Sequence, residues 1–72
     1  MNRDTLKGQW TQLKGKVLKQ WGKLTSDEVD QMQGNADILI GKIQERYGRN
    51  REQAEQDVDR WLQGQNPTPM TP

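Results

Sequence analysis

The chain contains no cysteine, no histidine and no phenylalanine among its 72 residues. Without cysteine it has no disulfide bond and no thiolate to serve as a nucleophile or a metal ligand. Without histidine it lacks the usual proton shuttle of enzymes and the commonest metal ligand in proteins. The only serine, Ser26, lies at a predicted helix start. We therefore expect a protein that is not an enzyme and that uses no cofactor or metal ion.

Long apolar runs are also missing. Hydrophobic residues make up only 29% of the chain, and no run approaches the roughly 18 apolar residues of a membrane-spanning helix. The first four residues, MNRD, contain neither an apolar signal region nor a glycine at position 2 for myristoylation. We therefore expect a cytoplasmic protein with no membrane partner.

Leucine, isoleucine and valine together make up only about 17% of the residues. So low an aliphatic content is found in disordered chains, but these usually carry a high net charge as well. Here the net charge is +1 and three tryptophans are present, each able to bury roughly 150 to 250 Å². We expect one folded, modestly stable domain that is a monomer.

A glycine pattern occurs twice. The segment GQWTQLKGKVLKQWGK covers residues 8–23, and GNADILIGKIQERYGR follows it at residues 34–49. The offset of 26 residues aligns Gly8 with Gly34, Gly15 with Gly41 and Gly22 with Gly48. Each copy reads as a long amphipathic helix, a glycine stop and a capped short helix. Because one pair of helices cannot bury both of its faces, a second copy supplies the missing wall.

The apolar spacing therefore predicts an all-α domain of four helices, arranged as two helical hairpins over residues 1–62. Capping boxes at Thr25 with Glu28, and at Asn50 with Gln53, mark the starts of the two short helices. Residues 63–72, which hold all three prolines, are predicted to form a disordered tail. The predicted core consists of Leu6, Trp10, Leu13, Val17, Trp21, Leu24, Leu39, Ile43, Tyr47, Val58 and Trp61.

Four glycines have predicted roles. Gly22 and Gly48 are expected to end the long helices in the left-handed conformation. Gly15 and Gly41 lie in mid-helix, at a cost of about 1 kcal/mol relative to alanine. One interpretation is a close approach between the two copies or a local break in each helix. The other is space for a ligand or for the backbone of a partner.

Basic and acidic residues alternate along the chain. Residues 1–24 carry six basic side chains and one acid, whereas residues 25–40 carry four acids and no base. This alternation indicates charge complementarity within the fold. A dedicated basic surface is the second interpretation, and its candidate residues are Lys16, Lys19, Lys23, Lys42 and Arg49. Since Glu45 occupies the position that matches Lys19 in the second copy, the pattern is interrupted, and nucleic acid is not expected as the main partner.

Several short motifs resemble the CsbD-like family, small bacterial proteins associated with the general stress response. They are Gly8-x-Trp10, Lys14-Gly15-Lys16, Trp21-Gly22-x-Leu24-Thr25 and the run GKIQERYG at residues 41–48. The resemblance implies two roughly orthogonal helical hairpins, similar to the SAM-domain-like class, and supplies no catalytic residue. The chain departs from the family pattern at Asn35, Ala36 and Ile38 and in its tail. Ile38 is either an added contact surface or extra core.

Three functions follow as hypotheses. The first is a non-enzymatic stress-response protein that acts through contacts with a protein partner or by general protection. The second is a weak nucleic-acid-binding protein that uses its hairpin turns. The third is a largely disordered hydrophilic protectant, which the ordered repeat disfavours.

Overall fold

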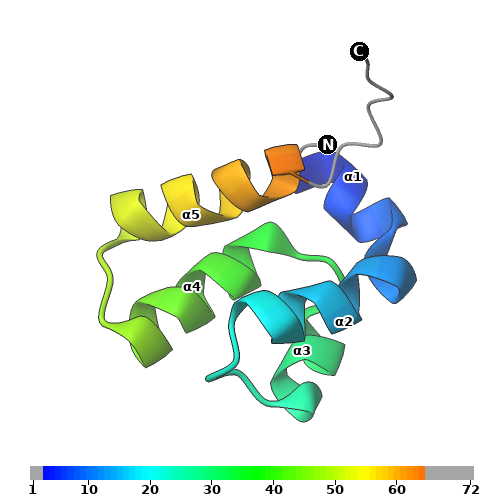
Figure 1. The fold of residues 1–72 in the computed structure, drawn as a ribbon, viewed down its shortest axis with the longest axis horizontal. Coiled ribbons are helices and arrows are strands. Elements are labelled where there is room, and N and C mark those ends of the chain that lie inside the picture. The colour runs from blue at the N-terminus through cyan, green and yellow to red at the C-terminus, as the bar shows by residue number, and fades with distance from the viewer. Residues whose placement is uncertain (1–2, 65–72) are drawn as a thin grey trace.

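The computed structural model describes residues 3–64 and is helical throughout, with no strand in that range (Figure 1). Its helices are α1 (Arg3–Gly8), α2 (Trp10–Gln20), α3 (Ser26–Met32), α4 (Ala36–Tyr47) and α5 (Arg51–Gly64). The all-α prediction is confirmed, but the prediction of four helices is wrong, because the described part of the chain has five. α5 extends two residues beyond the predicted domain boundary, and the rest of the predicted tail lies outside the described residues.

The additional helix arises because the predicted first helix is interrupted at Gln9. This residue has φ −116° and ψ 20°, so the chain leaves the helical conformation directly after Gly8. The Gln9 amide still donates to the carbonyl oxygens of Thr5 and Leu6, at 3.1 and 3.3 Å. The bend lets α1 contact α4 and α5 while α2 contacts α3. Leu6, the buried residue of α1, thereby joins the same core as the residues of α2.

Both predicted capping boxes are present. Thr25 Oγ1 accepts from the Glu28 amide at 3.1 Å, and Glu28 Oε1 accepts from the Thr25 amide at 3.0 Å. Asn50 Oδ1 accepts from the Gln53 amide at 2.8 Å, and Gln53 Oε1 accepts from the Asn50 amide at 3.3 Å. These reciprocal bonds satisfy amides that have no partner inside the helix, and they set where α3 and α5 begin.

The two predicted helix-stop glycines behave differently. Gly48 is the C-cap of α4 with φ 66°, in the left-handed region, as predicted. For Gly22 the prediction is wrong, because α2 ends at Gln20 with Trp21 as its C-cap at φ −120°. The Leu24 amide then donates to the Trp21 carbonyl at 3.0 Å. This turn reverses the chain without a left-handed residue.

Gly15 and Gly41 lie on the surface of uninterrupted helices. A Cβ atom built on either glycine would meet no heavy atom within 4 Å. The predictions of a close approach between the copies and of a local helix break are therefore wrong. The close approach is found at Gly34, which is buried with φ 81°, where a Cβ would overlap the backbone of Lys7. The turn between α3 and α4 thus lies directly against α1.

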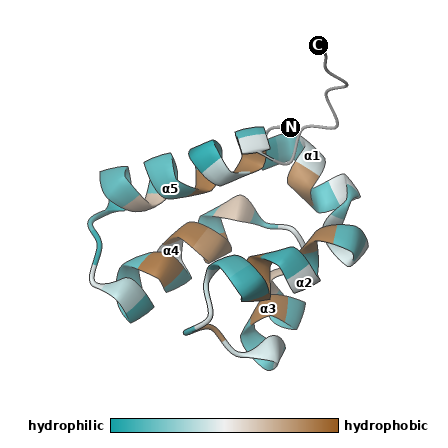
Figure 2. Cartoon of the chain, viewed as in Figure 1, coloured by the Kyte–Doolittle hydropathy of each residue, from teal (hydrophilic) through white to brown (hydrophobic). Residues whose placement is uncertain are grey.

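The core lies between α4 and the helices around it, and the hydrophobic residues face this interior (Figure 2). Of the predicted core residues, Tyr47 and Trp61 are only half-buried at its edge, and the others are buried. Within residues 3–64 no polar or charged residue is buried. Ile38 is 40% exposed and is a surface residue. The other buried hydrophobic residues within residues 3–64 are Val29, Met32, Ile40, Ala54 and Leu62.

Sequential neighbours make the helix pairs. α2 contacts α3, and α4 contacts α5, as two consecutive hairpins require. The twofold repeat of these hairpins and their orthogonal packing remain predictions.

Candidate interaction surface

The five candidate surface residues come from two helices and from the turns that follow them. Lys16 and Lys19 lie on α2 and Lys23 in the turn after it, whereas Lys42 lies on α4 and Arg49 in the turn after that helix. Two of the five residues form ion pairs within residues 3–64, and the other three do not.

Lys42 belongs to a junction between α3 and α4 that is centred on Glu28. Lys42 Nζ lies 3.2 Å from Glu28 Oε2, and Arg46 of the same helix contacts the same oxygen. Glu28 also accepts the Thr25 amide of the capping box. That backbone hydrogen bond is the main cause that lowers the Glu28 pKa to about 2, and hydrogen bonds from Lys42 and Arg46 lower it further, against an opposing effect of desolvation. Lys42 therefore stabilises the fold and is not a free cation.

Arg49 is also engaged. Its guanidinium pairs with the Asp57 carboxylate of α5, with Nη2 at 3.4 Å from Oδ1. The pair joins the turn between α4 and α5 to the middle of α5. Arg49 is therefore held against the protein rather than presented to a partner.

Further ion pairs join helices that are distant in the sequence. Arg3 of α1 pairs with Asp59 of α5 through two hydrogen bonds of 2.9 and 3.0 Å. The Asp59 hydrogen bond raises the Arg3 pKa. Lys14 of α2 pairs with Asp30 of α3 at 3.1 Å, across the first hairpin. Exposed pairs such as these each contribute at most about 1 kcal/mol, but together they occupy most of the acidic side chains of residues 3–64.

Lys16, Lys19 and Lys23 remain outside these pairs. Within residues 3–64 none of the three makes an ion pair, and all three are exposed. The spacing of three residues places Lys16 and Lys19 on one side of α2, and Lys23 lies in the turn directly after that helix. The Lys23 ammonium lies 5.0 Å from the centre of the Tyr47 ring, and the Lys23 amide donates to the Tyr47 hydroxyl at 3.1 Å. We call Lys16, Lys19 and Lys23 the α2 basic face.

Two exposed cations outside the predicted surface, Lys7 of α1 and Arg60 of α5, also make no ion pair within residues 3–64. Arg60 on α5 makes no ion pair with any described residue and lines a pocket. Its position after four acids in the segment 52–62 favours pairing with a nearby carboxylate. The neighbouring carboxylates of Asp57 and Asp59 are instead paired with Arg49 and Arg3.

No helix within residues 3–64 combines the length and apolar character needed to cross a membrane.

Comparison with known proteins places the chain among bacterial relatives. The CsbD-like family matches residues 4–56. The UPF0337 protein YjbJ of Escherichia coli O6:H1 is 56% identical over 61 residues, which cover 85% of this chain and 88% of the relative. The YjbJ protein of Salmonella typhimurium is 52% identical, with coverage of 85% and 87%. UPF0337 protein PA4738 of Pseudomonas aeruginosa is 52% identical over 58 residues, or 81% of this chain and 89% of that protein. The family match and these identities, which extend over nearly the whole folded region, show that the chain belongs to the CsbD-like family.

Proposed function

We propose that this chain is a non-enzymatic stress-response protein that acts through contacts between its folded surface and other proteins. The link to stress comes from the CsbD-like resemblance. The contact surface we assign is the α2 basic face, and the partner chemistry that fits it is an acidic protein surface. General protection without a defined partner is the broader form of the same proposal.

The observation that carries the proposal is that some of the candidate basic residues form ion pairs within the protein and others do not. Lys42 and Arg49 are held by Glu28 and Asp57, whereas Lys16, Lys19 and Lys23 form no ion pair within residues 3–64. Free charges of one sign on a helix and on the turn that follows it steer an oppositely charged partner and set its orientation. Because ion pairs to other helices hold Lys42 and Arg49 in place, a partner is expected to meet the α2 basic face first.

A structural role for the ionisable residues supports the non-enzymatic part of the proposal. Charged groups in residues 3–64 lie at the surface, where water weakens the electrostatic effects on which acid–base catalysis depends. The strongly lowered pKa of Glu28 has local structural causes in Thr25, Lys42 and Arg46. It serves the junction between α3 and α4.

Crosslinking in stressed bacterial cells tests this proposal. The protein with Lys16, Lys19 and Lys23 all changed to Gln is expected to lose its specific crosslinked partners. The matched control changes Gln31, Gln56 and Gln63 to Glu, which lowers the net charge by the same three units at exposed positions elsewhere. The control should retain the partners. Equal crosslinking by the two variants would contradict the assigned face, and equal melting curves would exclude unfolding as the cause of a loss.

Nucleic acid is the second candidate, favoured by the same three lysines. With Lys42 and Arg49 in ion pairs, we expect at most about three neutralised phosphates and a log–log salt slope no steeper than about −3. Anisotropy with duplex DNA at 50 and 150 mM salt measures this slope. Sub-micromolar binding that persists at the higher salt would make nucleic acid the leading candidate.

The cytoplasmic location and the monomeric state remain part of the proposal. Light scattering coupled to gel filtration measures the mass of the particle in solution.

A third hypothesis, a largely disordered protectant, is disfavoured by the apolar core that α1 to α5 share. Circular dichroism with a sigmoidal thermal transition is the expected result for the folded protein.

A further inference from the structure

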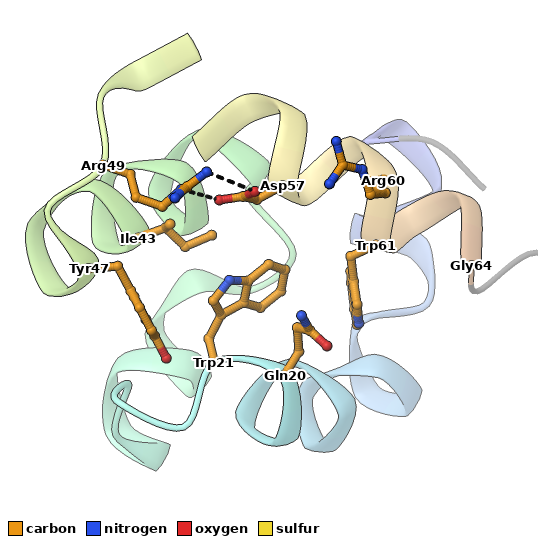
Figure 3. Close-up of a pocket in the computed structure, with 9 residues that line it drawn as sticks. All are labelled: Gln20, Trp21, Ile43, Tyr47, Arg49, Asp57, Arg60, Trp61 and Gly64. Atoms are coloured by element: carbon orange, nitrogen blue, oxygen red, sulfur yellow. Dashed lines mark hydrogen bonds and ion pairs between the residues drawn. The ribbon is translucent and has the colours of Figure 1, made fainter. Parts of the chain in front are cut away.

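A pocket of about 480 Å³ opens where the end of α2 meets α4 and α5 (Figure 3). Its volume lies within the range of roughly 300 to 1,000 Å³ that is common for small-molecule sites. It lies at the aromatic edge of the core, where Tyr47 and Trp61 are half-buried. The proposed protein partner does not account for this feature.

Three aromatic rings form the pocket walls. Trp21 and Trp61 contact each other edge to face, with ring centres 5.3 Å apart and planes inclined at 62°. Tyr47 lies on the other side of Trp21 in the view of Figure 3. Because Trp61 and Tyr47 are only half-buried, parts of their rings are available to a ligand. Flat apolar walls of this kind favour a planar, aromatic ligand.

The polar groups of the pocket are mostly hydrogen-bond donors without partners. Arg60 makes no ion pair within residues 3–64, and no described residue hydrogen-bonds the indole N–H groups of Trp21 and Trp61 or the side-chain amide of Gln20. The acid in the lining is Asp57, whose carboxylate is paired with Arg49. The lining therefore carries an excess of one positive charge and several free donors, which suit an anion.

We propose that this pocket binds a small aromatic carboxylate. The ring lies against the exposed part of Trp61, and the carboxylate accepts hydrogen bonds from the Arg60 guanidinium. A planar guanidinium matches a carboxylate with two parallel N–H···O bonds. An organic cation would also be attracted to aromatic faces, but Arg60 and Arg49 repel it. A simple inorganic anion would leave the aromatic walls uncovered.

Nuclear magnetic resonance of the indole N–H groups of the full chain tests the proposal. The three tryptophans give three indole signals, and the Trp10 nitrogen is buried outside the pocket lining, so its signal is an internal control. With 1-naphthoate as the probe, the Trp21 and Trp61 signals should shift saturably, with a dissociation constant of about 1 mM or lower, while Trp10 stays in place. The neutral 1-naphthamide and the ringless acetate should each bind at least about tenfold more weakly.

Two variants distinguish specific binding in the pocket from general attraction of an anion to positive charge. Arg60→Gln should weaken 1-naphthoate binding by about tenfold. Lys7→Gln, which removes the same charge from another exposed residue without an ion pair, should leave it unchanged. Both substitutions lie at the surface, so the fold should persist. The proposal is overturned if no signal saturates, if Trp10 shifts as much as Trp61, if the amide binds as tightly as the carboxylate, or if Arg60→Gln has no effect.

Discussion

The two copies of the glycine repeat, residues 8–23 and 34–49, share a spacing but use their equivalent residues differently. In the second copy only residues 48–50 connect α4 to α5, and Gly48 reverses the chain at once in the left-handed conformation. In the first copy residues 21–25 connect α2 to α3, and a turn from Trp21 to Leu24 makes the reversal. Connection length, rather than the presence of a glycine, decides whether a left-handed residue is needed.

The basic residues show the same divergence. Lys16 and Lys42 are equivalent in the repeat, as are Lys23 and Arg49, yet only Lys42 and Arg49 have carboxylate partners within residues 3–64. The reason is position in the fold. α4 contacts α1, α3 and α5, so acids from other helices reach its charged residues. The outer side of α2 has no such neighbour and keeps its charges free.

The largest expected difference between the copies concerns the equivalent aromatic residues Trp21 and Tyr47. Trp21→Ala should destabilise the fold by about 3 to 5 kcal/mol, because Trp21 is only 5% exposed. The equivalent Tyr47→Ala should cost about 2 kcal/mol, since Tyr47 is half-buried. Urea unfolding followed by circular dichroism measures both values. A larger loss for Tyr47 would reverse their assigned places in the core.

Gly34 and Gly8 form the next pair. Gly34→Ala should cost about 2 to 4 kcal/mol, because its positive φ is strained for alanine and the new Cβ overlaps Lys7. Gly8→Ala has open space around it and should be neutral or stabilise by up to about 1 kcal/mol. Thermal unfolding of the two variants checks the difference. Equal stabilities would contradict the close approach of the α3–α4 turn to α1.

Alanine substitutions at Gly48, which ends α4, and at its repeat equivalent Gly22 should differ by a smaller amount. Gly48→Ala forces alanine into a left-handed conformation and should cost about 1 to 2 kcal/mol. Gly22→Ala meets neither a positive φ nor a neighbouring atom within 4 Å, so its effect should be within about 0.5 kcal/mol of zero. The midpoints of urea unfolding distinguish the two. A cost at Gly22 as large as that at Gly48 would show that both connections use the same geometry.

Alanine substitution at Gly15 and at Gly41 should change stability by similar amounts. An effect on partner binding can therefore be separated from an effect on the fold. Alanine at either position should stabilise the isolated protein by about 0.5 to 1 kcal/mol, since both are exposed and mid-helix. Differential scanning calorimetry measures this gain. If Gly15→Ala also abolishes partner crosslinking while its melting temperature rises, the glycine supplies space for a partner backbone. Unchanged crosslinking would contradict that interpretation.

The contribution of Glu28 to the stability of the fold should depend on pH. Because its folded pKa is lowered to about 2 from the usual 4.5, Glu28 stabilises the fold above pH 4.5, and that contribution is lost as the pH falls toward 2. The difference in melting temperature between the natural protein and Glu28→Gln should therefore be constant near neutral pH and shrink over this range. The control Glu52→Gln alters an acid that makes no ion pair within residues 3–64. A pH-independent difference for Glu28→Gln would contradict its role in the junction.

Features that depend on residues close together along the chain could be predicted from the amino-acid sequence. Helical periodicity placed the apolar stripe of α2 and most of the core, and side chains three residues apart predicted the capping boxes at Thr25 and Asn50. Tertiary structure alone decided the interruption at Gln9, the packing of Gly34 against Lys7 and the pairing of Lys42 but not Lys16. Each of these depends on which distant segment lies opposite the residue, so equal spacing in the repeat leads to unequal environments. The same holds for the aromatic pocket, because Trp21 and Trp61 are forty residues apart in the chain and their rings come into contact only in the folded protein.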